Sequence, residues 1–95
     1  MGRDDTVAKW FLYVVKCRDS TLYTGITTDV SRRVYEHNNT SKGAKYTRPR
    51  RPVSLVYCRD FNDRSSATRA EIKFKKLSRK QKLEKIYKSK SKDLI

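Results

Sequence analysis

Two tyrosines lie in neighbouring apolar segments near the start of the chain. Tyr13 ends the run Phe11-Leu12-Tyr13, and Tyr23 begins the run Tyr23-Thr24-Gly25. Short aromatic and β-branched segments on either side of a polar turn are typical of a β-hairpin. A tyrosine hydroxyl can position water or exchange a proton, so two of them on adjacent strands form a candidate reaction site.

Charged side chains also lie on helix faces where apolar ones are expected. After the hairpin, Val30 and Val34 define the inward face of a helical segment, and Arg33 and His37 share that face. In a later helical segment, Glu71 lies on an apolar stripe made of Ala67, Ala70, Phe74 and Leu77. Burial of an unpaired charge is costly, so these residues need a partner or a function.

The inward charges have two interpretations. In the first, Arg33 and Glu71 form a buried ion pair between two helices, and the tyrosines are ordinary strand residues. In the second, the same groups hydrolyse a phosphodiester, which requires an activated water, positive charge on the phosphorane and help for the leaving oxygen. One glutamate is enough to hold Mg²⁺, because this ion keeps several waters. Serine or cysteine hydrolase chemistry is disfavoured, since His37 is the only histidine and no nucleophile elbow occurs.

The composition favours a nucleic-acid partner. The chain has 95 residues, enough for a single domain, with 24 Lys and Arg against 10 Asp and Glu and a net charge of +14. The positive electrostatic field of so short a chain attracts polyanions, and a nucleic acid is a better candidate partner than a membrane surface. No apolar run approaches the ~20 residues of a membrane span. The first residues lack a signal-peptide apolar region, which predicts a cytoplasmic protein.

Basic residues concentrate in the segment 40–52. Two prolines prevent a continuing helix there, so the segment is a polar loop. It is a candidate phosphate-contact surface, and a mobile solvated loop is the equally weighted alternative. Together with Lys73 in the later helix, the predicted nucleic-acid-binding residues are Lys42, Lys45, Tyr46, Arg48 and Arg51.

The expected elements follow the order β-β-α-β-α-α. Strands are predicted at 10–16, 22–27 and 53–59, with a helix capped by Thr28 or Asp29 that ends at Asn38 or Asn39. Ser65 and Ser66 are the expected caps of the next helix, and a capping box at 78–81 starts the last one. This order predicts a single α+β domain over residues 10–88, a small sheet flanked by helices. Residues 1–9 and 89–95 are expected to be a flexible leader and a flexible basic tail.

These residues together resemble the GIY-YIG nuclease superfamily. The likeness rests on Phe11-Leu12-Tyr13, Tyr23-Thr24-Gly25, Arg33 and Arg69-Ala70-Glu71. The stretches Gly43–Arg48 and Arg51-Pro52-Val53 and the basic final helix add to it. The likeness runs from Trp10 to Tyr87 and is strongest to small stand-alone bacterial members, similar to the catalytic domain of Slx-type structure-selective nucleases. Phe11-Leu12 replaces the Gly-Ile of the family name, Thr24 replaces its second Ile, and no accessory DNA-binding or zinc-binding domain is expected.

The resemblance implies a three-stranded antiparallel sheet and a role for each site residue. Tyr13 and Tyr23 would be the paired tyrosines, one of them general base or water positioner, with the choice left open. Arg33 would stabilise the pentacovalent phosphate, and His37 would assist proton transfer or position the phosphate. Glu71 would hold a divalent cation, Mg²⁺ or Mn²⁺.

The implied activity is that of a metal-dependent DNA endonuclease. Its substrate would be duplex or branched DNA, cut structure-selectively in repair or recombination, and a protein partner could supply specificity. The alternative is a non-catalytic nucleic-acid-binding module on the same fold.

Overall fold

Strands β1 (Trp10–Lys16), β2 (Leu22–Thr27) and β3 (Ser54–Phe61) form one antiparallel sheet in the order β2-β1-β3. This computed structural model describes residues 9–93. The central place of β1 agrees with its apolar residues on both faces, since central strands are covered on both sides. The first two strands have the predicted bounds. The third begins one residue later than predicted and continues two residues further, to Phe61.

A tight turn joins β1 to β2. Ser20 adopts a positive φ of 71°, and the side chain of Asp19 accepts hydrogen bonds from the amide and the hydroxyl of Thr21. Asp19 also pairs with Arg50 at 3.1 Å, which ties the hairpin to the loop 40–52. Asp is favoured in such turns because its side chain bonds the backbone two residues on.

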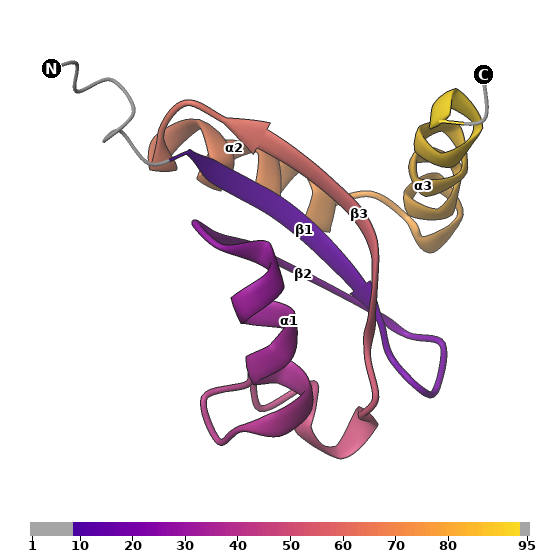
Figure 1. Ribbon diagram of the computed structural model, residues 1–95. Coiled ribbons are helices and arrows are strands. Elements are labelled where there is room, and N and C mark those ends of the chain that lie inside the picture. The colour runs from indigo at the N-terminus through magenta and orange to yellow at the C-terminus, as the bar shows by residue number, and fades with distance from the viewer. Residues whose placement is uncertain (1–8, 94–95) are drawn as a thin grey trace, which may run out of the picture.

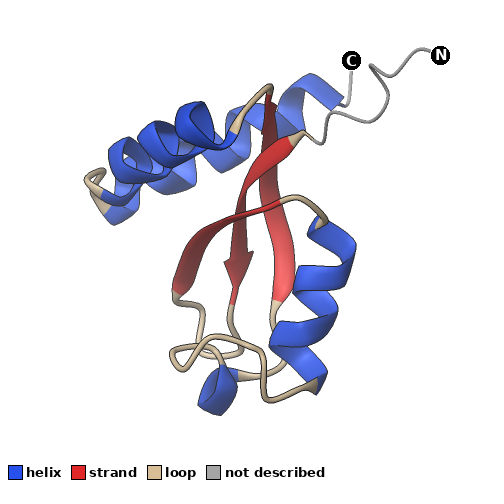
Figure 2. Cartoon of the chain, turned by 90° about the vertical axis from the view of Figure 1, so that its left-hand side faces the viewer, coloured by secondary structure: helices blue, strands red, loops and turns tan. Residues whose placement is uncertain are grey.

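Three helices cover the sheet. Helix α1 (Val30–Asn39) lies on one face, and α2 (Arg64–Lys75) and α3 (Arg79–Asp93) lie on the other (Figures 1 and 2). Each face has its own apolar cluster. The cluster under α1 includes Tyr13, Val15 and Val53, and the cluster under α2 and α3 includes Leu12, Val14, Phe74 and Ile86. The α+β class and the order β-β-α-β-α-α are therefore as predicted.

The helix ends follow capping chemistry, with two differences from the prediction. Asp29 caps α1 by accepting from the Arg32 amide, and the helix ends at Asn39, both as expected, but Thr40 and not an asparagine is the C-cap. Asp63, and not a serine, caps α2, because its carboxylate accepts from the Ser66 amide. The predicted capping box of α3 is confirmed by reciprocal hydrogen bonds between Ser78 and Gln81.

The described residues extend beyond the expected domain at both ends. Helix α3 continues to Asp93 and so includes residues 89–93 of the expected tail. Residues 1–8 of the expected leader lie outside the described range, and Lys9 pairs with Asp60 at 3.0 Å. Among the helices described, none is long and apolar enough to cross a membrane.

Candidate active site

Tyr13 and Tyr23 project from the same face of the sheet. In the ladder between β1 and β2, Tyr13 lies opposite Gly25 and Val15 lies opposite Tyr23. Because side chains alternate along a strand, Tyr13 shares a face with Val15, and therefore with Tyr23. Both tyrosines pack in the cluster under α1, Tyr13 buried and Tyr23 half-buried. The hairpin thus brings the two predicted tyrosines to one wall of a site.

Gly25 makes room for the Tyr13 side chain. A Cβ atom at position 25 would lie 2.7 Å from the Tyr13 hydroxyl oxygen and 2.9 Å from its Cζ atom. Those separations are too short for non-bonded atoms, so any larger residue would displace the tyrosine. A glycine in a strand often marks such a close approach. The glycine therefore sets the position of the Tyr13 hydroxyl.

His37 is completely buried and contacts both tyrosines. Its Nε2 atom lies 2.7 Å from the Tyr13 hydroxyl, and its ring meets that of Tyr23 edge-on at 5.3 Å between centroids. Its Nδ1 atom lies 3.0 Å from Oγ1 of Thr47 and 3.3 Å from the amide nitrogen of Ala44. The buried ring has no surface for a substrate, and its contact with the site is the Tyr13 hydroxyl.

The surrounding hydrogen bonds assign a tautomer to His37. The Ala44 amide donates to Nδ1, which must therefore carry a lone pair. The Thr47 hydroxyl has two acceptors at 3.0 Å, the Ala44 carbonyl and Nδ1, so the Ala44 amide alone decides the assignment. The proton of the neutral ring then lies on Nε2, which donates to the Tyr13 hydroxyl oxygen. This leaves the hydroxyl hydrogen of Tyr13 for another partner.

Burial shifts the pKa values of both members of this pair. Burial lowers the pKa of His37 to about 4, and the charge of Arg33 acts in the same direction. Burial also raises the pKa of Tyr13 to about 12, although the neighbouring Arg33 guanidinium opposes that shift. The charges of Tyr23 and Glu71 contribute to the rise of the Tyr13 pKa. At neutral pH, His37 is uncharged and Tyr13 keeps its proton.

Arg33 is held by its own helix and by the loop that follows. Its Nη1 atom donates to Oε1 of Glu36 and to the carbonyl of Lys42, both at 2.9 Å. Burial lowers the pKa of Arg33, but Glu36 and Tyr13 outweigh this effect and the net shift is upward. Arg32 also pairs with Glu36, at 3.7 Å. Arg33 thus keeps its charge beside Tyr13.

The interpretation of a buried ion pair between Arg33 and Glu71 is wrong. Glu71 pairs with Lys75 one turn along α2, at 3.1 Å, while Arg33 pairs with Glu36. The Glu71 side chain is 20% exposed, and its charge reaches the Tyr13 hydroxyl. Within residues 9–93, no three His, Cys, Asp or Glu side chains gather in one place. Glu71 is accordingly a carboxylate that pairs within its own helix and acts on Tyr13 through its charge.

Tyr46 extends the aromatic wall outward. Its ring stacks on that of Tyr23, with 6.2 Å between centroids and 19° between planes, and the Arg50 guanidinium lies 3.9 Å from the Tyr46 centroid. A surface hollow lined by Tyr23, Tyr46, Lys75 and Lys82 adjoins this stack. Cationic and aromatic groups in one hollow suit contact with a nucleic acid.

The other predicted nucleic-acid-binding residues divide into three groups. Lys42, Lys45 and Arg48 are exposed on the loop beside α1. Arg51 instead turns inward, and its guanidinium donates to the carbonyls of Glu36, His37 and Thr40. We therefore assign Arg51 to the C-terminus of α1, whose unpaired carbonyls it satisfies. Lys73 lines a pocket on the opposite face of the sheet.

Two contacts of the site were not predicted. Thr47 is completely buried against His37, and Lys75 holds Glu71. The spacing of Glu71 and Lys75 within one helix is a signal that could have revealed the second contact. Nothing local in the sequence marks Thr47, because its partner comes from another element.

Comparison with known proteins places this arrangement in a family. Residues 9–93 match the family model described as the GIY-YIG catalytic domain. The chain belongs to the GIY-YIG family. Its GIY-YIG domain contains β1, β2, α1 and α2, which carry the tyrosines, Arg33 and Glu71. The resemblance inferred from the sequence is confirmed at the level of the superfamily, which is one of nucleases; the Slx-type likeness stays a prediction.

Relatives of the GIY-YIG domain include small bacterial proteins. A UPF0213 protein of Desulfotalea psychrophila is 58% identical over 69 residues, which cover 73% of this chain and 63% of that protein. A UPF0213 protein of Staphylococcus haemolyticus is 52% identical over 84% of this chain and 96% of its own length.

Two solution NMR structures resemble this domain. The UPF0213 protein BH0048 from Bacillus halodurans is 42% identical, with a TM-score of 0.55 over 83% of each chain. The protein EF2693 from E. faecalis is 45% identical, with a TM-score of 0.58 over 92% of this chain and 88% of its own.

Proposed function

We propose that this GIY-YIG domain is a divalent-metal-dependent DNA endonuclease. The observation that carries the proposal is the meeting of Tyr13, Tyr23 and His37 on one face of the sheet. The charges of Arg33 and Glu71 also act on the pKa of Tyr13. Strongly perturbed groups that meet in this way are characteristic of functional sites. A net charge of +14 supports a polyanionic substrate.

Arg33 is suited to bind the phosphate. Its fixed hydrogen bonds to Glu36 and Lys42 both use Nη1, so the donors on Nε and Nη2 remain for Tyr13 and a phosphate oxygen. An arginine that is already held in position stabilises the charge that develops in the transition state, because its guanidinium does not have to reorient during the reaction.

Tyr13 is suited to orient the attacking water. His37 donates to its hydroxyl oxygen and fixes its position, and the hydroxyl hydrogen and one lone pair remain for a water. The same Nε2–H donor, together with Arg33, would stabilise the phenolate if the hydroxyl loses its proton. Tyr23 is half-buried and stacks on Tyr46, so it would line the path of the DNA.

Glu71 fits the requirements of a magnesium or manganese site. Its carboxylate is partly exposed, and its partner Lys75 is 54% exposed and can move away. One carboxylate suffices for Mg²⁺, which keeps water and takes substrate phosphate as further ligands. When bound, the ion would supply positive charge to the phosphorane and the leaving oxygen.

Cleavage of defined DNA substrates tests the proposal. Blunt, nicked, flapped and branched duplexes would be incubated with the wild type and Mg²⁺, Mn²⁺ or EDTA. We expect metal-dependent cleavage, with a preference for nicked, flapped or branched forms if the enzyme is structure-selective. Glu71→Gln and Arg33→Gln should each lower the rate at least about 100-fold, since each removes transition-state charge stabilisation.

Glu84→Gln is the matched control. Glu84 is an exposed residue of α3, so Glu84→Gln changes the net charge by the same amount as Glu71→Gln and should leave cleavage unchanged. DNA binding without cleavage above the Glu71→Gln level, in any metal and on any substrate, would support a non-catalytic nucleic-acid-binding module instead.

A further inference from the structure

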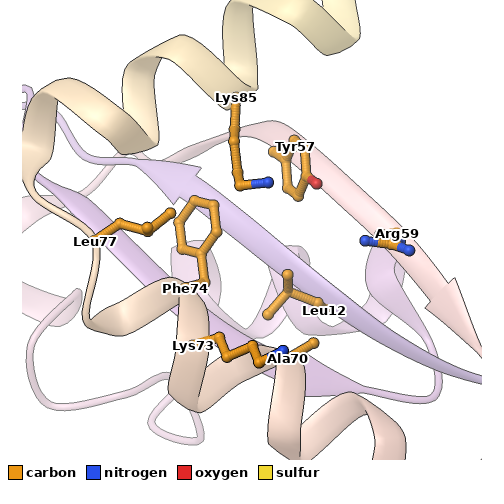
Figure 3. A pocket seen from close by; sticks show the side chains of 8 residues that line it. All are labelled: Leu12, Tyr57, Arg59, Ala70, Lys73, Phe74, Leu77 and Lys85. Atoms are coloured by element: carbon orange, nitrogen blue, oxygen red, sulfur yellow. The ribbon is translucent and has the colours of Figure 1, made fainter.

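A pocket of about 220 Å³ opens on the face of the sheet opposite to Tyr13 (Figure 3). Its apolar wall includes Leu12 and Phe74, which belong to the core cluster under α2 and α3. Tyr57 of β3 stacks on Phe74, with 5.7 Å between ring centroids and 23° between planes. Tyr57 is only half-buried, so the pocket presents an aromatic surface.

Three cations from three elements surround this aromatic wall. Arg59 comes from β3, Lys73 from α2 and Lys85 from α3, and no carboxylate is among the residues that line the pocket. Figure 3 shows the Lys85 side chain extending from α3 toward the two aromatic rings. Among residues 9–90, the ion pairs formed involve none of these three cations. An aromatic pocket with unopposed positive charge selects an anion that carries a flat apolar group.

We propose that this pocket binds one nucleotide of a single DNA strand. The base would lie against Tyr57, and its phosphates would contact Lys73 and Lys85. A volume of about 220 Å³ is below the roughly 300–1,000 Å³ of pockets for drug-sized ligands, which suits one base and not a dinucleotide cofactor. Duplex DNA cannot use the aromatic wall, because its bases are stacked and paired.

A basic path joins the pocket to the candidate active site. Lys82 lines the hollow beside Tyr23, and its Nζ atom lies 6.0 Å from the ring centroid of Phe74 in the pocket wall. A strand that leaves the hollow over Lys82 therefore reaches the pocket between α2 and α3. The inference rests on the proposed function in one respect, that the bound strand belongs to the DNA substrate.

Binding of a fluorescent oligothymidylate, measured by anisotropy in EDTA, tests this site. The double variant Lys73→Gln/Lys85→Gln should bind the single strand about tenfold more weakly than Lys76→Gln/Lys80→Gln. The second variant is the matched control, because it removes two exposed lysines that do not line the pocket, Lys76 at the C-cap of α2 and Lys80 of α3. Both variants should bind a blunt duplex equally. EDTA separates the outcome from the proposed activity, since binding can persist where cleavage is absent.

Two results would overturn the proposal. One is an equal loss of single-strand affinity in both double variants. The other is that unlabelled oligoglutamate displaces the fluorescent single strand as effectively as unlabelled oligothymidylate does. Titration of thymidine 5′-monophosphate into the ¹⁵N-labelled wild type avoids dependence on variants. Amide shifts should centre on Tyr57 and Phe74, and shifts confined to β2 and α1 would contradict the site.

Discussion

The Tyr13 hydroxyl and Nε2 of His37 are 2.7 Å apart, and both side chains are almost completely buried. The contact joins the central strand to the helix that carries Arg33. It places a neutral imidazole against a hydroxyl whose pKa the charges of Arg33 and Glu71 also influence. The relationship connects stability to the candidate chemistry, because displacement of either partner also displaces the other.

The burial of His37 predicts that folding stability depends on pH. Its pKa is about 4 in the folded protein against 6.5 for the free side chain, so the unfolded state binds more protons between these values. Stability should be complete above pH 6.5 and fall as the pH drops to 4, by about 3 kcal/mol at most. Urea unfolding at several pH values measures this slope. The slope should be much smaller in His37→Gln. The carboxylates of Glu36, Asp60 and Asp63 have lowered pKa values, so they take up protons mainly below the pH range in which His37 does.

Gly25→Ala should displace Tyr13. The added Cβ would lie 2.7 Å from the hydroxyl oxygen, which forces the ring or the strand to move. Overpacking of this kind costs about 1–3 kcal/mol of unfolding free energy, and cleavage should fall with it. Urea denaturation and the ring NMR signals of Tyr13 measure both effects. An alanine variant with wild-type stability and unshifted Tyr13 signals would contradict the close approach.

Arg51 and Arg48 should have opposite effects, although both are arginines of one loop. Arg51→Gln should lower the unfolding free energy by about 1–3 kcal/mol, because it removes the donor of the His37 carbonyl and one donor each from the carbonyls of Glu36 and Thr40. Arg48→Gln should leave stability unchanged and weaken DNA binding at low salt. Thermal unfolding and salt-dependent DNA binding distinguish the two. Equal stability of both variants would contradict the structural role of Arg51 and favour the phosphate contact that the sequence predicted.

Lys75→Gln should strengthen metal binding at Glu71. The lysine pairs with the carboxylate at 3.1 Å and competes with a cation for it. An exposed ion pair is worth about 0.2–1 kcal/mol, so the affinity for Mn²⁺ should rise up to about fivefold. Electron paramagnetic resonance of Mn²⁺ without DNA measures this, and Lys80→Gln is the control for lost positive charge. A rise of the same size in the control would assign the effect to net charge.

Local patterns were enough to predict most of the architecture. Alternating aromatic and β-branched residues place β1 and β2, and the capping residues Asp29 and Ser78 mark helix starts, because hydrogen bonds within one turn decide these features. The same patterns show that Arg33, His37 and Glu71 lie on inward faces. The ends of α3 and β3 were predicted poorly, since they depend on packing against other elements.

Only the tertiary structure decides what each inward charge meets. The sequence is equally compatible with an ion pair between Arg33 and Glu71 and with the observed pairs to Glu36 and Lys75. Likewise, Arg51 turns inward and Arg48 outward in one basic loop, because the end of α1 happens to lie beside the first and not the second. Spacing along a chain determines which face a residue occupies, whereas its partner depends on elements far away in the sequence.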